Sequence, residues 1–348
     1  MQTLPNNTKD SQTPLISFIL PYYNVPVSML NECIESIRAL SLGKEEREII
    51  IIDDGSDESP INSLEHLADE IIYIRQSNAG LGAARNRGMQ VASGQYLQFI
   101  DSDDRLLPDA YEQCLAMLRK ADTPDLIMFN FISSENLPHL QNLQNLPNLP
   151  NLPNLQNLQN LPNLPTGAEY MLRHNIHATA CCYIFRRAIL GGLLFTPGIY
   201  HEDEEFTPQL LLRAESVADT GAQAYFYRKR SNSITTGTGI RKTVKRLEDT
   251  RKVIAKLSLT ADTMPPIERQ AMQRRVAQLT MDYIYGIIIQ TGNRHYLERK
   301  VDYLRRNGLF PLPNRQYTMK YRWFRLLSST YAGRTLLMRI LPLMNKER

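Results

Sequence analysis

The sequence predicts an α/β protein in which a doubly wound mixed sheet is followed by a helical C-terminal region. In the first third of the chain, apolar runs of strand length alternate with helix-length amphipathic segments, at the spacing of right-handed parallel crossovers. Polar and acidic motifs follow several of these runs, and open α/β sheets bind ligands beyond the carboxyl ends of their strands. Beyond about residue 240, only helical periodicity remains.

The expected strands of the first part are short apolar runs, several of them rich in β-branched residues. They cover residues 15–20, 48–52, 71–75, 95–100 and 125–131. The helices expected between them cover residues 27–40, a segment before residue 71, the segment that follows the Gly-rich residues 78–82, and residues 108–120. Together these elements predict a nucleotide-binding half over residues 15–131.

Residues 136–165 differ in kind from the rest of the chain. They form ten triplets in which Leu is always central and Pro or Gln is always third. A period of three does not match the 3.6-residue period of a helix, and frequent Pro opposes a helix. The segment is expected to be a low-complexity surface insertion, and a Leu-lined extended spacer of polyproline II type is the alternative.

An acceptor-side half over residues 166–239 is expected to complete the first domain, which then spans residues 1–239. One expected helix covers residues 167–173, and another begins in the acidic run 201–206 and continues to residue 213. The expected strands cover residues 178–186, 217–219 and 224–227. Residues 240–348 are expected to form a basic helical region. Its four expected helices cover residues 242–257, 267–289, 295–306 and 322–344.

Charge is divided unevenly between these two parts. Residues 1–239 hold 17 Lys and Arg against 28 Asp and Glu, whereas residues 240–348 hold 23 against 8, so that −11 and +15 give the net charge of +4. The acidic first part does not suit nucleic acid, and we expect no nucleic-acid partner. The basic, apolar segment 322–344 leaves two alternatives open: it lies on an anionic membrane surface, or it caps the catalytic domain.

Cysteine usage and the N-terminal segment indicate the cellular compartment of the protein. Cys33, Cys114, Cys181 and Cys182 stand in apolar surroundings without metal-site spacing, which predicts buried thiols in a reducing compartment. The polar N-terminal segment lacks a signal-peptide pattern, and no apolar stretch approaches the roughly 18 residues of a spanning helix. We therefore expect a cytoplasmic protein, either soluble or peripheral on the inner face of the cell membrane.

The most informative stretch is Asp101-Ser102-Asp103-Asp104. It follows an apolar run that predicts a buried strand, so its three carboxylates leave the sheet together at the carboxyl end of that strand. Clustered carboxylates repel one another unless a cation neutralises them, and a hard divalent ion with phosphate oxygens usually does so. Taken alone, the stretch would also suit an Asp-rich solvated turn.

Five motifs occur in one order along the chain. They are PYYN after the first strand, DDGS after the second, NAGLGAARNRG leading into a helix, DSDD after the fourth strand, and the later HEDEEF. This combination resembles the family 2 glycosyltransferases of GT-A fold over about residues 15–235, apart from the triplets. The resemblance implies transfer of a sugar, with inversion, from a nucleotide-sugar (UDP-linked by expectation) to a glycan or lipid-linked acceptor. Such a transfer would serve bacterial-type surface polysaccharide biosynthesis.

The resemblance also implies a donor site that is assembled from these motifs and from the segment 227–233. The expected nucleotide-sugar-binding residues are Pro21, Tyr23, Asp53, Asp54, Gly80, Arg85, Asp101, Ser102, Asp104, Arg228 and Arg230. The carboxylates of Asp53 and Asp54 suit a base N–H or a ribose hydroxyl. Arg85, near a helix start, suits a diphosphate or a base carbonyl. For Tyr23, packing in the core is the alternative.

Asp103 is the expected ligand of a divalent metal, Mn²⁺ or Mg²⁺. The ion would bridge the two phosphates and stabilise the charge that develops on the departing nucleoside diphosphate. By the same resemblance, Asp203 is the expected general base that removes the acceptor's hydroxyl proton, and Glu202 orients the acceptor or the backbone. Four acids at a helix N-terminus would also suit the helix dipole, which is the structural alternative for this motif.

Two other functions share parts of the pattern. A sugar-nucleotide pyrophosphorylase has a similar layered sheet, but it opens with a Gly-rich loop and a basic residue, where residues 21–24 here are Pro-Tyr-Tyr-Asn. A catalytically inactive GT-A-fold scaffold would use the Leu triplets and the basic tail for interactions. The carboxylates at Asp101, Asp103 and Asp203 argue against that alternative.

Overall fold

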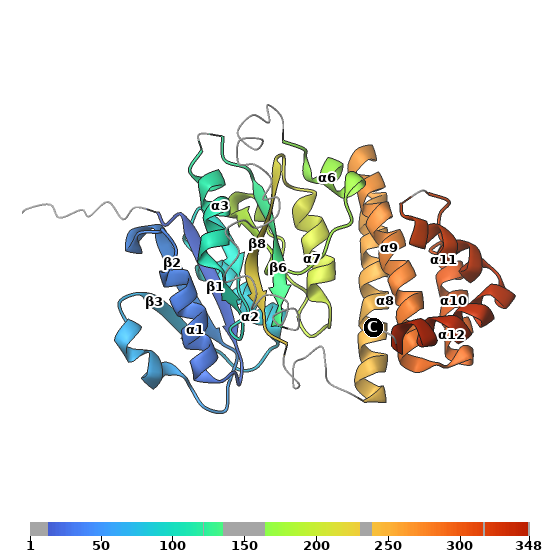
Figure 1. The fold of residues 1–348 in the computed structure, drawn as a ribbon, viewed down its shortest axis with the longest axis horizontal. Helices are drawn as coiled ribbons and strands as arrows, with labels where there is room; N and C mark the ends of the chain where they lie inside the picture. Colours follow the sequence, from blue (N-terminus) through green and yellow to red (C-terminus); the bar gives the residue numbers. More distant parts are fainter. Residues whose placement is uncertain (1–12, 121, 135–163, 230–238, 316, 347–348) are drawn as a thin grey trace, which may run out of the picture. The chain divides into compact units, whose positions relative to one another are not determined.

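The computed structural model describes residues 13–120, 122–134, 164–229, 239–315 and 317–346 (Figure 1). The chain forms two compact units, between which it passes several times. The first unit contains Met1–Leu164, Ala180–Gly198 and Ala214–Lys229, and the second contains Pro165–Thr179, Ile199–Arg213 and Arg230–Arg348. The triplet insertion lies almost entirely outside the described residues, so its expected structure stays a prediction.

The first unit is built on a mixed sheet. Its strands are β1 (Ile16–Tyr22), β2 (Arg47–Asp53), β3 (Ile71–Arg75), β4 (Tyr96–Phe99), β5 (Arg105–Leu106), β6 (Leu126–Ser133), β7 (Tyr183–Arg186) and β8 (Val217–Tyr227). Their order in the described part of the chain is β3-β2-β1-β4-β7-β6-β8-β5. Strands β1 to β4 run parallel, and β7 is antiparallel to both of its neighbours. The arrangement confirms the predicted fold class.

The helices of the first unit pack on this sheet. They are α1 (Val27–Arg38), α2 (Leu81–Val91) and α3 (Pro108–Leu118), with the short 3₁₀ helices η1 (Lys44–Glu46), η2 (Ile61–Leu67) and η5 (Arg187–Leu190). Helix α2 lies very close to β1, because a Cβ atom built on Gly88 would stand 2.2 Å from Cγ2 of Ile19. Asn86 ties the same helix to Phe195: its amide donates to the carbonyl of Phe195 and accepts from the N–H of that residue.

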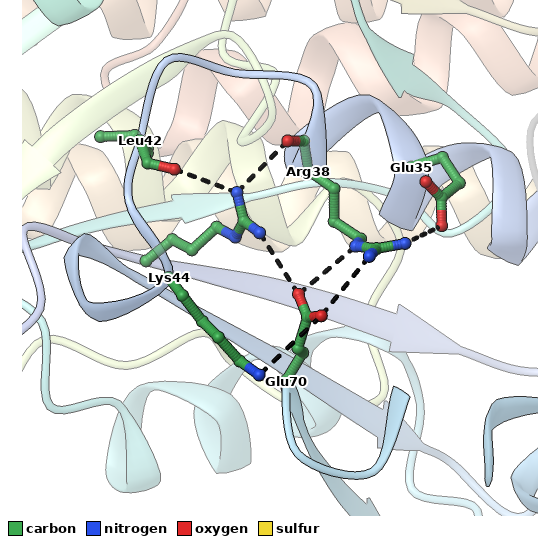
Figure 2. Close-up of polar contacts among 6 residues, drawn as sticks. Glu35, Arg38, Leu42, Lys44 and Glu70 are labelled. Atoms are coloured by element: carbon green, nitrogen blue, oxygen red, sulfur yellow. Dashed lines mark hydrogen bonds and ion pairs between the residues drawn. The ribbon is translucent and has the colours of Figure 1, made fainter. Parts of the chain in front are cut away.

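Figure 2 shows a cluster of charged side chains at the amino-terminal ends of β2 and β3. The carboxylate of Glu70 lies 3.3 Å from Arg38, 4.0 Å from Lys44 and 3.2 Å from Arg47. Arg47 also donates to the carbonyls of Arg38 and Leu42, so it fixes the chain between α1 and β2. Burial alone would raise the pKa of Glu70, but the three cations outweigh it and hold that pKa below its usual value.

The second unit is helical. Its helices are α6 (Gly167–Arg173), α7 (Glu202–Leu211), α8 (Ile240–Asp262), α9 (Pro266–Thr291), α10 (Arg294–Arg306), α11 (Met319–Ser329) and α12 (Tyr331–Lys346). Helix α9 contacts α6, α8, α10, α11 and α12, so it is the central helix of this unit (Figure 1). Its buried side chains, including Tyr283, Ile284 and Ile287, join one apolar core with Leu257 of α8 and Leu297 of α10.

Two predictions about single elements were wrong. The segment 322–344 is not one helix, because α11 ends and α12 begins around Thr330, whose backbone is extended. The hydroxyl of Thr330 accepts from the N–H of Gly333, as an N-cap side chain does, and Ser and Thr at this point compete with helical hydrogen bonding. The strands expected at 217–219 and 224–227 are one strand, β8, with a register shift around Gly221, where φ is +64°.

All four cysteines are buried and free, which confirms the prediction of buried thiols. Of the described helices, none combines the length and the apolar character that crossing a bilayer requires.

Candidate active site

The donor motifs of the first unit gather at one edge of its sheet. In the parallel ladders Tyr22 pairs with Asp53, and Ile19 pairs with Phe99. The carboxyl ends of β1, β2 and β4 therefore lie side by side. PYYN and DDGS begin in the last residues of β1 and β2, and DSDD follows one residue after β4. This is the edge at which open α/β sheets bind their ligands.

Asp54 joins the DDGS turn to the Gly-rich segment. One of its carboxylate oxygens accepts from Gln76 Nε2 at 2.7 Å and from the N–H of Ala79 at 3.0 Å, and the other accepts from the N–H of Gly80 at 2.8 Å. Gly80 has φ +91°, a conformation that favours glycine, and α2 begins at the next residue. Asp54 thus fixes the backbone that leads into α2.

Asp53 is fully buried and is held by different donors. It accepts from the N–H of Ser56 at 2.8 Å and from the hydroxyl of Tyr73 at 2.7 Å, and the Nε of Arg75 lies 3.6 Å away. Burial and the nearby Asp53 raise the pKa of Tyr73 to about 12, although a hydrogen bond with Ser59 acts in the opposite direction. The tyrosine is therefore a protonated donor at neutral pH.

The two tyrosines that follow the first strand differ in their surroundings. Tyr22 is buried and donates to the carbonyl of Val25 at 2.7 Å, whereas Tyr23 is 50% exposed. Packing in the core therefore describes Tyr22 and not Tyr23. The neighbouring Asn24, with φ +50°, accepts and donates hydrogen bonds with Asp57 of the DDGS turn, so the first two motifs are tied together.

Arg85 is only 3% exposed and lies behind the acidic motif. Its Nη2 donates to Oδ1 of Asp101 at 3.0 Å, and its guanidinium lies over the rings of Phe99 and Phe195. Such a buried, charge-assisted pair fixes the orientation of the Asp101 carboxylate. A direct role of Arg85 toward the donor stays a prediction.

Asp104 is buried and joins the acidic motif to the end of β8. Its oxygens accept from the hydroxyl of Tyr225 and from the N–H of Arg228, both at 2.7 Å. Burial, followed by the charges of Asp101 and Asp103, raises the pKa of Asp104 to about 8. Ser102 is also buried, whereas Asp101 and Asp103 are half-buried.

The segment after β8 was expected to supply two arginines. The guanidinium of Arg228 forms an ion pair with Glu32 of α1 at 2.5 Å. Arg230 lies outside the described residues.

The acidic motif does not form a complete metal cage. Across the described ranges, no group of three or more His, Cys, Asp or Glu side chains is arranged to hold an ion. Asp101 is paired with Arg85, and Asp104 is engaged by two donors. Carboxylate oxygens such as those of Asp101 and Asp103 are suitable ligands for a hard divalent ion, and Mg²⁺ usually takes further ligands from phosphates and water.

The expected general base lies in the second unit. Glu202 and Asp203 begin α7 directly after His201, which has the left-handed backbone values φ 61° and ψ 39°. One oxygen of Asp203 accepts from the N–H of Glu204 at 2.9 Å. Because the motif belongs to the other unit, the combined action of Asp203 and Asp103 stays a proposal.

Two cations that the sequence analysis did not identify hold the start of α7. Arg275 of α9 binds Glu204 and also donates to the carbonyl of Ile176 at 3.1 Å, and Lys256 of α8 binds Glu205. These ion pairs join residues 71 and 51 positions apart, so no local pattern could indicate them. The last two of the four consecutive acids, Glu204 and Glu205, are thereby paired with cations.

Comparison with known proteins agrees with these motifs. The sequence matches the family profile "Glycosyl transferase family 2" over residues 17–194, which is 178 of its 348 residues. It is 40% identical over 124 residues to the putative glycosyltransferase EpsH of Bacillus subtilis (strain 168), covering 34% of this chain and 34% of that protein. It is 28% identical over 230 residues to the uncharacterized glycosyltransferase EpsJ of the same strain, covering 64% of this chain and 63% of that protein. The chain thus spans about a third of EpsH and less than two thirds of EpsJ.

Solved structures support the fold. S. aureus TarS in complex with UDP-GlcNAc has a TM-score of 0.58 and 17% identity, with 90% of this chain and 79% of that chain covered. The mannosyltransferase PcManGT from Pyrobaculum calidifontis, in complex with GDP-Man and Mn²⁺, has a TM-score of 0.53 and 12% identity, with coverages of 96% and 88%. The match of the family profile to just over half of the sequence shows that this chain belongs to glycosyltransferase family 2.

Proposed function

We propose that this protein is an inverting glycosyltransferase that acts in surface polysaccharide biosynthesis. It would move a sugar from a nucleotide donor, UDP-linked by expectation, to a glycan or lipid-linked acceptor at the cytoplasmic side of the cell membrane. The observation that carries the proposal is the gathering of PYYN, DDGS and DSDD at one edge of a parallel sheet, with the Gly-rich segment fastened to them by Asp54. Membership of family 2 supports the reaction class, and related structures hold UDP-GlcNAc or GDP-Man.

Some of the proposed donor-site residues would contact the donor, and others would support the shape of its site. Tyr23 is exposed at the edge of the sheet where these motifs meet, and it offers an aromatic face to the base. Asp53 and Asp54 are buried and already accept hydrogen bonds, so we assign to them the shaping of the base and ribose site, with any direct contact made through remaining lone pairs. Gly80 brings the backbone close to the donor, and Arg85 orients Asp101 toward the ribose.

Asp103 would hold a divalent ion at the diphosphate, with Asp101 beside it. Bound there, Mn²⁺ or Mg²⁺ supplies charge stabilisation for the departing nucleoside diphosphate. Asp104 and Ser102, in the turn between β4 and β5, would support this edge, because both are buried and Asp104 is hydrogen-bonded to Tyr225 of β8. Arg228 and Arg230 are proposed to face the diphosphate, for which Arg228 would have to leave Glu32.

Asp203 is the proposed general base. Its carboxylate would take the proton of the acceptor hydroxyl as that oxygen bonds to the anomeric carbon, and the bond from that carbon to the diphosphate would break. General-base assistance of this kind contributes roughly 10²- to 10⁴-fold to the rate. Glu202 would orient the acceptor, and the ion pairs at Glu204 and Glu205 would keep the start of α7 in place.

The test is a screen of UDP- and GDP-sugars for Mn²⁺-dependent turnover, followed by two variants. Asp103→Ala should lose the metal-dependent hydrolysis of the preferred donor, and Asp203→Asn should keep donor affinity while it loses transfer. Asp69→Asn, which changes an exposed acid before β3 outside these motifs, is the control and should behave as wild type. Transfer retained in Asp203→Asn would remove this residue from the mechanism. A protein that binds no nucleotide and responds to no metal would instead favour the inactive scaffold.

A further inference from the structure

Helices α11 and α12 bury one face and expose large apolar side chains elsewhere. Their buried residues include Tyr321, Phe324, Ser328, Arg334 and Leu337, of which Tyr321, Phe324 and Leu337 belong to the core of the second unit. The exposed apolar residues are Met319, Trp323 and Leu326 on α11, Tyr331 where α12 begins, and Leu336, Ile340, Leu343 and Met344 on α12. Trp323 is 62% exposed and Leu343 is 66% exposed. The core of this unit therefore does not account for these side chains.

The exposed apolar residues follow helical spacing. On α11, residues 319, 323 and 326 are separated by four and three positions, and on α12, residues 336, 340 and 343 repeat the same spacing. Side chains at such positions share one face of a helix. Each helix thus has two apolar faces, one in the core and one in solvent, and we call the two solvent-exposed faces together the α11–α12 surface.

The described residues of α11 and α12 themselves carry charge of one sign only. Residues 303–346 contain no Asp or Glu, whereas they contain nine cations. These are Arg305, Arg306, Arg315, Lys320, Arg322, Arg325, Arg334, Arg339 and Lys346. Lys320 and Arg322 are exposed beside Trp323, and Arg339 is exposed beside Ile340. Arg334, by contrast, is buried and paired with Glu298, so it serves the fold.

We propose that the α11–α12 surface binds the headgroup region of an anionic lipid bilayer. Apolar and aromatic side chains with flanking Lys and Arg are the combination by which helices lie in a membrane interface. No described helix is suited to cross the bilayer, so the contact is interfacial. A second copy of the chain is a poorer occupant, because a two-fold interface would bring two acid-free basic surfaces together.

The chain carries its own reporter, since Trp323 is its single tryptophan. Full-length protein is mixed with vesicles of phosphatidylcholine alone or of phosphatidylcholine with phosphatidylglycerol, and Trp emission and vesicle flotation are measured. With the anionic vesicles the emission should shift to shorter wavelength and the protein should float, and added salt should weaken both effects. Vesicles of phosphatidylcholine alone should bind far less protein.

Matched variants assign the contact to these residues. Lys320→Gln and Arg339→Gln should each weaken binding about fivefold, and Leu326→Gln with Leu343→Gln should weaken it at least about tenfold while the reporter remains. Leu259→Gln changes a residue of α8 that is 71% exposed and lies outside the α11–α12 surface, so it should bind like wild type. All these positions are exposed, and circular dichroism checks the fold of each variant.

Several outcomes would overturn the proposal. They are binding that is equal on both kinds of vesicle, absence of binding, and equal losses in Leu259→Gln and in the surface variants. An emission shift that depends on protein concentration without vesicles would identify a second copy as the occupant. A shift with soluble polyglutamate but not with vesicles would identify an acidic polypeptide instead.

Discussion

Replacing Asp54 by Asn tests whether this residue supports the backbone of segment 76–80 or contacts the donor directly. Asn preserves the shape of the side chain but has one carbonyl oxygen and one NH₂ group. In one orientation the NH₂ group faces the N–H of Gly80, and in the other it faces Gln76 and the N–H of Ala79. Either way, at least one charge-assisted hydrogen bond is lost and two donors oppose each other.

The size of the expected effect follows from the hydrogen bond that is lost. A hydrogen bond to a charged group contributes about 1.5–3 kcal/mol, so loss of one of the three makes opening of the segment 76–80 easier by about 2 kcal/mol. Amide hydrogen exchange measures such local opening, and at 1.36 kcal/mol for each factor of ten the exchange at Ala79 and Gly80 should accelerate about 30-fold. Donor affinity should fall at the same time, because this backbone leads into α2 at the edge of the sheet where the donor motifs meet.

The control is Asp57→Asn. Its carboxylate accepts from Asn24 on the surface, so exchange at Ala79 and Gly80 should be unchanged in this variant. If Asp54→Asn loses donor binding while both amides exchange as in wild type, Asp54 contacts the donor without supporting the loop. If the amides accelerate but donor affinity is unchanged, the segment 76–80 does not belong to the donor site. Either result refutes the assignment of Asp54 as a support within that site.

Three further predictions concern packing, positioning and pH. Gly88→Ala should lower the thermal stability of the first unit. Overpacking against Ile19 costs about 1–3 kcal/mol, which exceeds the ~1 kcal/mol that the higher helix propensity of Ala contributes. An unchanged melting temperature would contradict the close packing. Arg275→Ala should lower kcat with little change in donor KM. Arg275→Lys should restore part of kcat, because Lys can still pair with Glu204. A change confined to donor KM would argue against a role of Arg275 in positioning α7. Because the pKa of Glu70 is lowered in the folded state, its contribution to stability is present above the unfolded value of about 4.3 and is lost as pH falls through the folded pKa. Denaturant titrations should therefore show a smaller loss on acidification for Glu70→Gln than for wild type, and equal losses would contradict this.

The parts of the fold that the sequence could predict are those that depend on periodicity. Apolar runs predicted β1 to β4 within a few residues, and the parallel crossovers then required PYYN, DDGS and DSDD to meet at one edge. The division of the segment 322–344 into α11 and α12 does have a signal in the sequence. Ser328, Ser329 and Thr330 precede the break, and such residues favour caps over helix interiors.

The partners of the polar side chains could not be predicted in this way. A pattern shows which side chains are apolar, but it does not show which tertiary neighbours approach a given charge. Arg85 was assigned to the donor from its place near a helix start, yet in the structure its guanidinium pairs with Asp101. Asp104 belongs to the same acidic run as Asp103, but the hydroxyl of Tyr225 and the N–H of Arg228, just after β8, donate to it from more than 100 residues away.

The segment 322–344 left two alternatives open, contact with a membrane surface and capping of the catalytic domain, and contacts with the acceptor half come from other helices of the C-terminal region. Capping of the acceptor side is a property of α8 and α9, because Lys256 and Arg275 bind acids in the first turn of α7 and one backbone carbonyl beside them. The exposed apolar and basic residues belong to α11 and α12, which do not contribute these contacts. The two proposed roles, holding the base in place and binding lipid, therefore involve different helices of one region. Substitutions at Arg275 and at Leu343 should accordingly impair different measurements, turnover for the first and vesicle binding for the second, and their effects should be independent in the double variant.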